Sequence, residues 1–113
     1  MKIAIVGSRG LQVNDLENYI PEDATEIVSG GARGIDTCAR HYAHKKGLRL
    51  TEFLPDYAKY GRRAPLVRNL EIIDYADRVI AFWDGKSSGT GHVIINCKRR
   101  NKKIRILMPK SAL

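Results

Sequence analysis

Glycine, serine and arginine gather in three short loops of this sequence, and together these residue types can bind a phosphate group. The loops read GSRG (7–10), SGGARG (29–34) and DGKSSGTG (84–91). Glycine lets backbone N–H groups come close to a ligand, hydroxyl groups donate hydrogen bonds, and arginine adds positive charge. A helix that begins near Ile35 would add the positive end of its dipole. An anion, most simply a phosphate, is the ligand that these loops suit.

Strand-like and helix-like segments alternate around the three loops. Apolar runs typical of strands cover residues 2–6, 26–29, 49–54, 78–83 and 104–108. The segments between them have apolar residues at helical spacing and predict helices near 16–20, 35–47, 65–73 and 90–100. Strict alternation predicts a Rossmann-like three-layer α/β sandwich, with a five-stranded parallel sheet and helices on both faces. At 113 residues the chain fits one such domain, residues 1–113.

The polarity of each strand predicts its place in the sheet. KIAIV (2–6) and VIAFW (79–83) are almost wholly apolar, as strands buried on both faces should be. RLTEFL (49–54) and IRILM (104–108) include charged residues and tolerate an edge. The predicted order is therefore 3-2-1-4-5, with right-handed crossovers. Ligands of such sheets bind beyond the carboxyl ends of the strands where the winding reverses, and the three glycine-rich loops end there.

The loop residues expected to bind the ligand share one rim of this sheet. They are Gly7, Ser8, Arg9, Ser29, Gly30, Gly31, Arg33, Gly34, Trp83, Asp84, Ser88, Gly89 and Thr90. Short loops between strands and helices favour glycine and serine in any case, which explains one such loop more easily than three. Trp83 could stack on a base or close the core, and Asp84 could simply begin a turn. His92 could reach the same rim.

Several familiar motifs are absent. GSRG lacks the GxGxxG spacing, and the second strand ends in Ser-Gly instead of an acid that would hold a ribose, which argues against an ordinary NAD site. GKS (85–87) looks like the end of a P-loop, but Ile80 occupies the position of the first glycine. Cys38, His41 and His44 follow each other at steps of three, which spreads them around a helix. We expect no metal and no cofactor.

Positive charge is concentrated at the end of the chain. The net charge is +8, and residues 98–113 include seven Lys or Arg and no acid. Weak, salt-sensitive nucleic-acid binding is therefore expected through Lys98, Arg99, Arg100, Lys102 and Lys103. No apolar stretch approaches the ~20 residues of a membrane span, and we expect a cytoplasmic protein that makes no membrane contact. The sequence leaves open whether it is a monomer or a homo-oligomer.

Four motifs in order resemble the SLOG superfamily, in particular its small YspA-like branch, which is related to YpsA. They are GSR (7–9), SGGARGID (29–36), PDYAKYGRRAPLVRN (55–69) and AFWDGKSSGT (81–90), and they span nearly the whole chain. This resemblance implies a Rossmann-like domain that binds nucleotides or nucleotide-derived ligands, including ADP-ribose-like compounds. More distant similarities point to the DNA-processing protein A family, which binds single-stranded DNA, and to the Lonely Guy phosphoribohydrolases, which act on nucleoside monophosphates.

The resemblance also assigns residues. Arg68 and Asn69 become ligand-binding residues, because Arg68 aligns with an arginine of both relatives, although Glu71 three residues later would equally suit a surface salt bridge. Gly89 and Thr90 match the Gly-Thr of the Lonely Guy loop, but Val93 replaces its glutamate. Cleavage of an N-glycosidic bond needs a carboxylate. Asp36 or Asp84 could substitute for the missing glutamate. Because Val93 itself cannot, we expect binding rather than catalysis, with nucleic-acid binding and N-glycosidic hydrolysis as alternatives.

Overall fold

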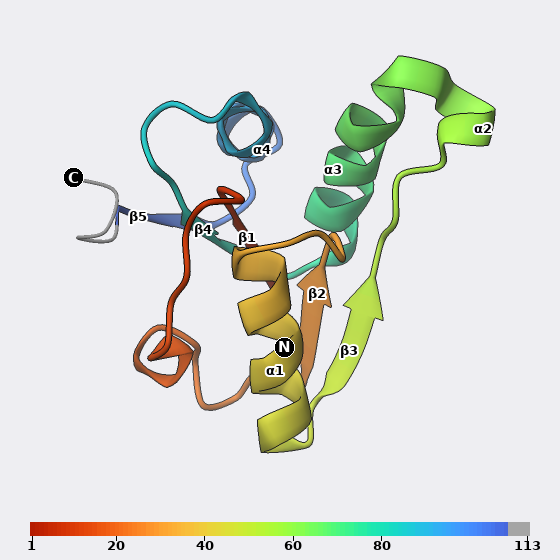
Figure 1. Ribbon diagram of the computed structural model, residues 1–113. Coiled ribbons are helices and arrows are strands. Elements are labelled where there is room, and N and C mark those ends of the chain that lie inside the picture. Colours follow the sequence, from red (N-terminus) through yellow and green to blue (C-terminus); the bar gives the residue numbers. More distant parts are fainter. Residues whose placement is uncertain (109–113) are drawn as a thin grey trace.

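A single parallel sheet organises the computed structural model, which describes residues 1–108 (Figure 1). Its strands are β1 (Lys2–Gly7), β2 (Glu26–Ser29), β3 (Arg49–Glu52), β4 (Arg78–Phe82) and β5 (Ile104–Leu107). All neighbouring strands pair in parallel, in the order β3-β2-β1-β4-β5. This confirms the order predicted from strand polarity, with β1 and β4 side by side at the point where the winding reverses.

Three helices of 12 residues each cover the sheet: α1 (Ile35–Lys46), α3 (Ala64–Tyr75) and α4 (Ser88–Arg99). In Figure 1, α1 lies on one face, and α3 and α4 lie on the other. Gly47 ends α1 in the left-handed conformation with φ 67°, as the sequence predicts. The structure is therefore a Rossmann-like parallel α/β fold.

The alternation of side chains along β1 divides the core in two. Ile3 and Ile5 point toward α1 and are completely buried. Ala4 and Val6 point the other way and pack with residues of α3 and α4, such as Ile72. A buried parallel strand must be apolar on both faces, which is why β1 reads as a continuous apolar run.

The segment between β1 and β2 differs from the predicted helix at 16–20. It forms only a 3-10 turn, Leu16–Asn18. The apolar side chains of this segment, which include Leu11, Val13, Leu16 and Ile20, instead pack onto the sheet beside α1. Apolar spacing reported the burial of these residues correctly, but Pro21 leaves no room for a longer helix.

Three predicted strands, β3, β4 and β5, are shorter than expected, and β5 ends at Leu107 instead of Met108. β3 ends at Glu52, because the Leu54 side chain is exposed to solvent ahead of Pro55. The Phe53 N–H still donates a hydrogen bond to the Ser29 carbonyl at 2.9 Å. Trp83 follows β4 and donates its backbone N–H to the Leu107 carbonyl at 2.8 Å.

The segment that connects β3 to α3 contains structure of its own. Asp56 caps the one-turn helix α2 (Tyr57–Tyr60) by accepting the Lys59 N–H at 3.1 Å, and a 3-10 turn, Gly61–Arg63, leads into α3. Figure 1 shows α2 projecting beyond the end of β3. No helix in residues 1–108 combines the length and the apolar character that crossing a membrane requires.

Candidate ligand-binding crevice

A crevice of about 900 Å³ opens at the carboxyl ends of β1, β2 and β4. Its walls come from the loop after β1, the loop between β2 and α1, the first two turns of α3, and the segment from β4 into α4. The crevice thus lies at the switch point between β1 and β4. The predicted residues that line it are Gly7, Ser8, Arg9, Gly30, Arg68, Asn69, Asp84, Ser88, Gly89 and Thr90.

Five predicted residues, namely Ser29, Gly31, Arg33, Gly34 and Trp83, do not line the crevice. Gly34 has φ +70°, and a Cβ there would overlap the carbonyl oxygen of Arg9. A Cβ at Gly31, with φ +71°, would lie 2.6 Å from Leu54 Cδ2. These two glycines therefore let neighbouring loops pack closely, a role independent of any ligand.

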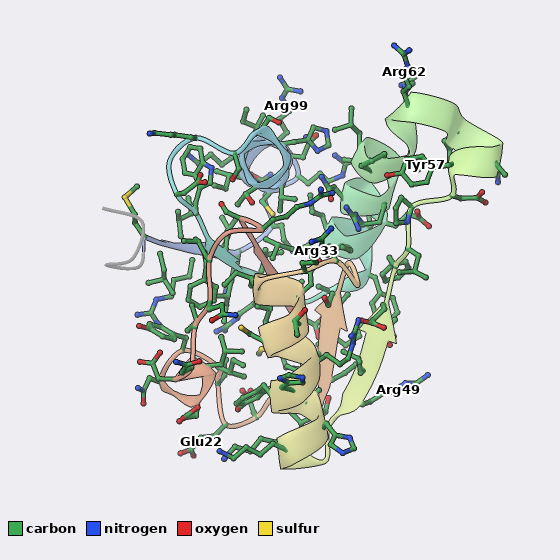
Figure 2. All side chains as sticks on the ribbon, in the orientation of Figure 1. Glu22, Arg33, Arg49, Tyr57, Arg62 and Arg99 are labelled. Atoms are coloured by element: carbon green, nitrogen blue, oxygen red, sulfur yellow. The ribbon has the colours of Figure 1, made fainter. Side chains whose placement is uncertain are left out.

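The other three residues outside the crevice have distinct positions. Ser29 is completely buried, and its Oγ accepts the Gly31 N–H at 3.3 Å. Trp83 donates its indole N–H to the Ser87 carbonyl at 3.0 Å and packs against the core beneath α4. Arg33 is exposed on the loop between β2 and α1 (Figure 2) and lines a shallower hollow beside the crevice.

The turn before α4 is held by Asp84. Its Oδ1 accepts the Lys86 N–H at 2.8 Å, the Ser87 N–H at 2.7 Å and the Ser87 hydroxyl at 3.1 Å. Hydrogen bonds to the charged carboxylate lower the pKa of Asp84 to about 2. The hydroxyls of Ser87 and Ser8 lie 2.5 Å apart, which ties this turn to the loop after β1. Asp84 therefore begins a turn, as one of the two interpretations held, and still lines the crevice.

The first turn of α4 presents hydrogen-bond donors at the crevice. The N–H groups of Ser88, Gly89 and Thr90 have no partner within the helix, because they precede its first hydrogen bond, from the Gly91 N–H to the Ser87 carbonyl. The Thr90 side chain is 6% exposed, and its hydroxyl makes no hydrogen bond within residues 1–108. Among the described residues, every side-chain oxygen or nitrogen that is sealed from solvent has a hydrogen-bond partner. The Thr90 hydroxyl has none, so it is not sealed, and because Thr90 lines the crevice its hydroxyl faces that space.

Two glycines at the crevice have no structural requirement of their own. A Cβ added to Gly10 or Gly89 would meet no atom within 4 Å, and neither residue has a positive φ. Glycine within a helix is less favourable than alanine by about 1 kcal/mol, so its presence at position 89 costs stability. The absence of a side chain leaves the backbone uncovered at this point of the crevice wall.

Arg68 reaches the crevice from α3 and is partly buried. Its Nη1 donates to the Gly30 carbonyl at 2.9 Å, and its Nε donates to Asn69 Oδ1 at 3.0 Å. The surface salt bridge with Glu71 does not form, and no ion pair of Arg68 occurs within residues 1–108. Burial lowers the pKa of Arg68, while the nearby charge of Asp36 opposes that shift.

Asp36 and His92 also line the crevice, although the sequence assigned neither a firm role. Asp36, in the first turn of α1, is 8% exposed, and its Oδ2 accepts the Ala32 N–H at 2.9 Å. Burial raises the pKa of Asp36, and the Ala32 hydrogen bond and the Arg68 charge oppose the rise. The sequence signal for Asp36 was its place in the SGGARGID motif, two residues after the SGGARG loop.

The beginning of α3 adds apolar residues to the crevice wall. Pro65 and Leu66, in the first turn of α3, line it together with Arg62. Figure 2 shows Arg62 on the turn between α2 and α3. In the sequence, the motif PDYAKYGRRAPLVRN (55–69) covers this wall.

The basic residues near the chain end are separate from the crevice, because none of them lines it. Two of the five are engaged within the fold. Arg100 pairs with Asp74 through Nε and Oδ1 at 3.0 Å, and Lys102 donates to the Ala76 carbonyl. Lys98, Arg99 and Lys103 are exposed, and Figure 2 shows Arg99 on α4.

No family model matches the chain, and no curated protein or solved structure shows significant similarity to it. Within residues 1–108, no three His, Cys, Asp or Glu side chains are grouped so that they could hold a metal ion. The crevice itself is therefore the feature that points to a function.

Proposed function

We propose that the crevice binds the phosphate of a nucleotide or of a nucleotide-derived ligand such as an ADP-ribose-like compound. The observation that carries this proposal is the state of Arg68. Its guanidinium is partly withdrawn from water and has no ion pair within residues 1–108. A desolvated charge is costly unless it is paired. The charge of Asp36 acts on Arg68 but forms no salt bridge with it, so an anion in the crevice would supply a direct partner.

The first turn of α4 supports a phosphate as that anion. Its free N–H groups and helix dipole favour negative charge, and the Thr90 hydroxyl offers one more donor. Gly10 and Gly89 leave the backbone uncovered where the ligand would approach. The apolar surface of Pro65 and Leu66 would suit a less polar part of the same ligand, such as a nucleoside.

The resemblance to the SLOG superfamily agrees with this role, because its motifs supply most of the crevice wall. A binding function is favoured over N-glycosidic hydrolysis. Val93 stands where the Lonely Guy relatives carry glutamate, and it is 2% exposed and packs in the core formed by α3 and α4. We infer a sensor or binding domain.

Isothermal titration calorimetry and thermal unfolding with AMP, ADP and ADP-ribose test the proposal. We expect at least one ligand to bind the parent and to raise its melting temperature, as binding to the native state alone requires. Arg68→Met should weaken that binding at least about tenfold, the size expected when a charged hydrogen-bonding group is lost. The matched control is Arg63→Met, because Arg63 is exposed and lies outside the crevice. Equal binding by the parent and Arg68→Met would refute the proposal, as would no binding to the parent.

A further inference from the structure

The Asn69 side chain lies between Arg68 and α4 and is 6% exposed. Its Oδ1 accepts the Arg68 Nε–H at 3.0 Å. Its Nδ2 lies 3.3 Å from His92 Nδ1 and 3.5 Å from the Gly89 carbonyl. Arginine can only donate hydrogen bonds and a carbonyl can only accept them, so the amide has a single sensible orientation. Reversing it would place two donors together at Arg68 and two acceptors together at Gly89.

This orientation fixes the protonation of His92. Because Asn69 Nδ2 donates, His92 Nδ1 must accept, and the ring is then neutral with its proton on Nε2. Burial and the charges of Arg100 and Arg99 lower the pKa of His92 and favour the same neutral state. The carbonyl of His92 accepts a hydrogen bond from the Asn96 side-chain Nδ2 at 2.9 Å, which anchors the backbone of this turn independently of the ring.

We propose that His92 is a positioning residue of the ligand site, which holds the Arg68 guanidinium in its binding orientation through the Asn69 amide. This inference rests on the proposed function, because the oriented group is the one that would meet the phosphate. The chain of contacts runs from the Gly30 carbonyl through Arg68 and Asn69 to His92, and it joins the loop after β2 to the first turns of α3 and α4.

The arrangement leaves a defined part of Arg68 for the ligand. Nε and one hydrogen of Nη1 are used within the protein, while Nη2 has no hydrogen bond within residues 1–108. A guanidinium fixed on two sides has lost its rotamer freedom before the ligand arrives, which lowers the entropic cost of binding. Without an acceptor at His92, the Asn69 Nδ2 keeps only the longer 3.5 Å contact with the Gly89 carbonyl, so the partner of the Arg68 Nε–H is held less firmly.

The test compares His92→Phe, which has no acceptor, with His92→Gln, whose Oε1 can accept from Asn69. His41→Phe is the control, because His41 is exposed and lies outside the crevice. The first measurement is the solvent-exchange rate of the Arg68 Nε–H by ¹⁵N NMR, without ligand. We expect slow exchange in the parent, His41→Phe and His92→Gln, and faster exchange in His92→Phe. The ¹⁵N shifts of His92 should show an unprotonated Nδ1 at neutral pH.

The second measurement is AMP affinity by calorimetry. His92→Phe should weaken AMP binding about threefold to tenfold, the range for one hydrogen bond, and His92→Gln should recover most of it. In the Arg68→Met background, His92→Phe should cause no further loss, whereas additive losses would mean that His92 contacts the ligand directly and would overturn the inference. Unchanged Arg68 Nε–H exchange in His92→Phe would also overturn it. If the parent binds no nucleotide, the proposed function fails, and the exchange rates alone decide whether His92 positions Arg68.

Discussion

The Arg68 guanidinium and the Gly30 carbonyl are joined by a 2.9 Å hydrogen bond that links α3 to the loop after β2. This contact explains the glycine at position 30. A Cβ there would lie 2.5 Å from Arg68 Nη1 and 3.1 Å from Asp36 Oδ2. Gly30 therefore makes room for an arginine of the same chain.

Gly30→Ala should displace Arg68 and reduce AMP affinity about as much as Arg68→Met does. Overpacking of this kind costs about 1 to 3 kcal/mol of unfolding free energy, which chemical denaturation would measure. Gly91→Ala is the control, because its Cβ would make only an ordinary 3.6 Å contact with Trp83 and the residue lies outside the crevice. If Gly30→Ala binds AMP as the parent does, the position of Arg68 is unimportant for binding.

Thr90→Val should separate binding from stability. Valine keeps the shape of threonine, and the hydroxyl has no partner within residues 1–108, so the unfolding free energy should stay within about 0.5 kcal/mol of the parent. AMP affinity should fall about threefold to tenfold, as for the loss of one hydrogen bond.

Thr51→Val should lower the unfolding free energy and leave AMP affinity unchanged, the opposite of Thr90→Val. The Thr51 hydroxyl donates at 2.7 Å to Oε2 of Glu26, a residue that is 7% exposed, so its loss should cost about 1 kcal/mol of stability. AMP binding should not change, because Thr51 lies outside the crevice. For Thr90→Val, by contrast, a loss of stability with unchanged AMP affinity would contradict the prediction, because the Thr90 hydroxyl would then serve the fold.

Strand order and the position of the crevice were predictable because they depend on patterns along the chain. The apolar character of β1 and β4 placed them at the centre, and the glycine-rich loops marked the switch point. The hydrogen-bond partner of Arg68 was not predictable in this way. Helical spacing offered Glu71 as its partner, whereas its actual partner Gly30 lies 38 residues away and is brought close only by tertiary packing.

The individual glycines also needed the structure. Gly31 and Gly34 look like ligand-binding residues in the sequence, yet their positive φ angles and close neighbours assign them to loop packing. Gly89 looks no different, yet a Cβ there would meet no atom of residues 1–108 within 4 Å, so packing within these residues does not require glycine at this position. A sequence pattern reports that glycine is needed in a loop, but not which atom would otherwise collide.

Asp84→Asn should reduce the acid sensitivity of the fold. The pKa of Asp84 is about 2 in the folded state, against an ordinary 3.8, because three donors stabilise its charged form. A lowered pKa stabilises the fold above pH ~4, and this contribution is lost as the pH falls toward 2. Urea unfolding at a series of pH values should show the parent more stable than Asp84→Asn near pH 6, with the difference shrinking between pH ~4 and ~2. A constant difference would contradict this account.

The exposed basic residues near the chain end should bind nucleic acid weakly and without sequence preference. Replacing Lys98, Arg99 and Lys103 with glutamine should weaken binding to a single-stranded oligonucleotide and reduce the slope of log K against log salt by up to ~0.7 per lost phosphate contact. AMP binding should persist, since none of the three lines the crevice. Tight binding that survives high salt and disappears in Arg68→Met would instead place the nucleic acid in the crevice.

The protein should not release free base efficiently from AMP. Val93 lines the crevice but is aliphatic, so it offers no carboxylate; because it is only 2% exposed and also packs in the core, Val93→Glu would bury a charge and should destabilise the fold. Asp84 is held by three donors in its turn. Asp36 is therefore the crevice carboxylate best placed to act, although its Oδ2 accepts the Ala32 N–H. Loss of a general base typically lowers a rate by ~10² to 10⁴. Chromatography of AMP incubated with the parent and with Asp36→Asn measures the outcome: adenine release by the parent that Asp36→Asn abolishes would identify Asp36 as a catalytic base and the protein as a hydrolase.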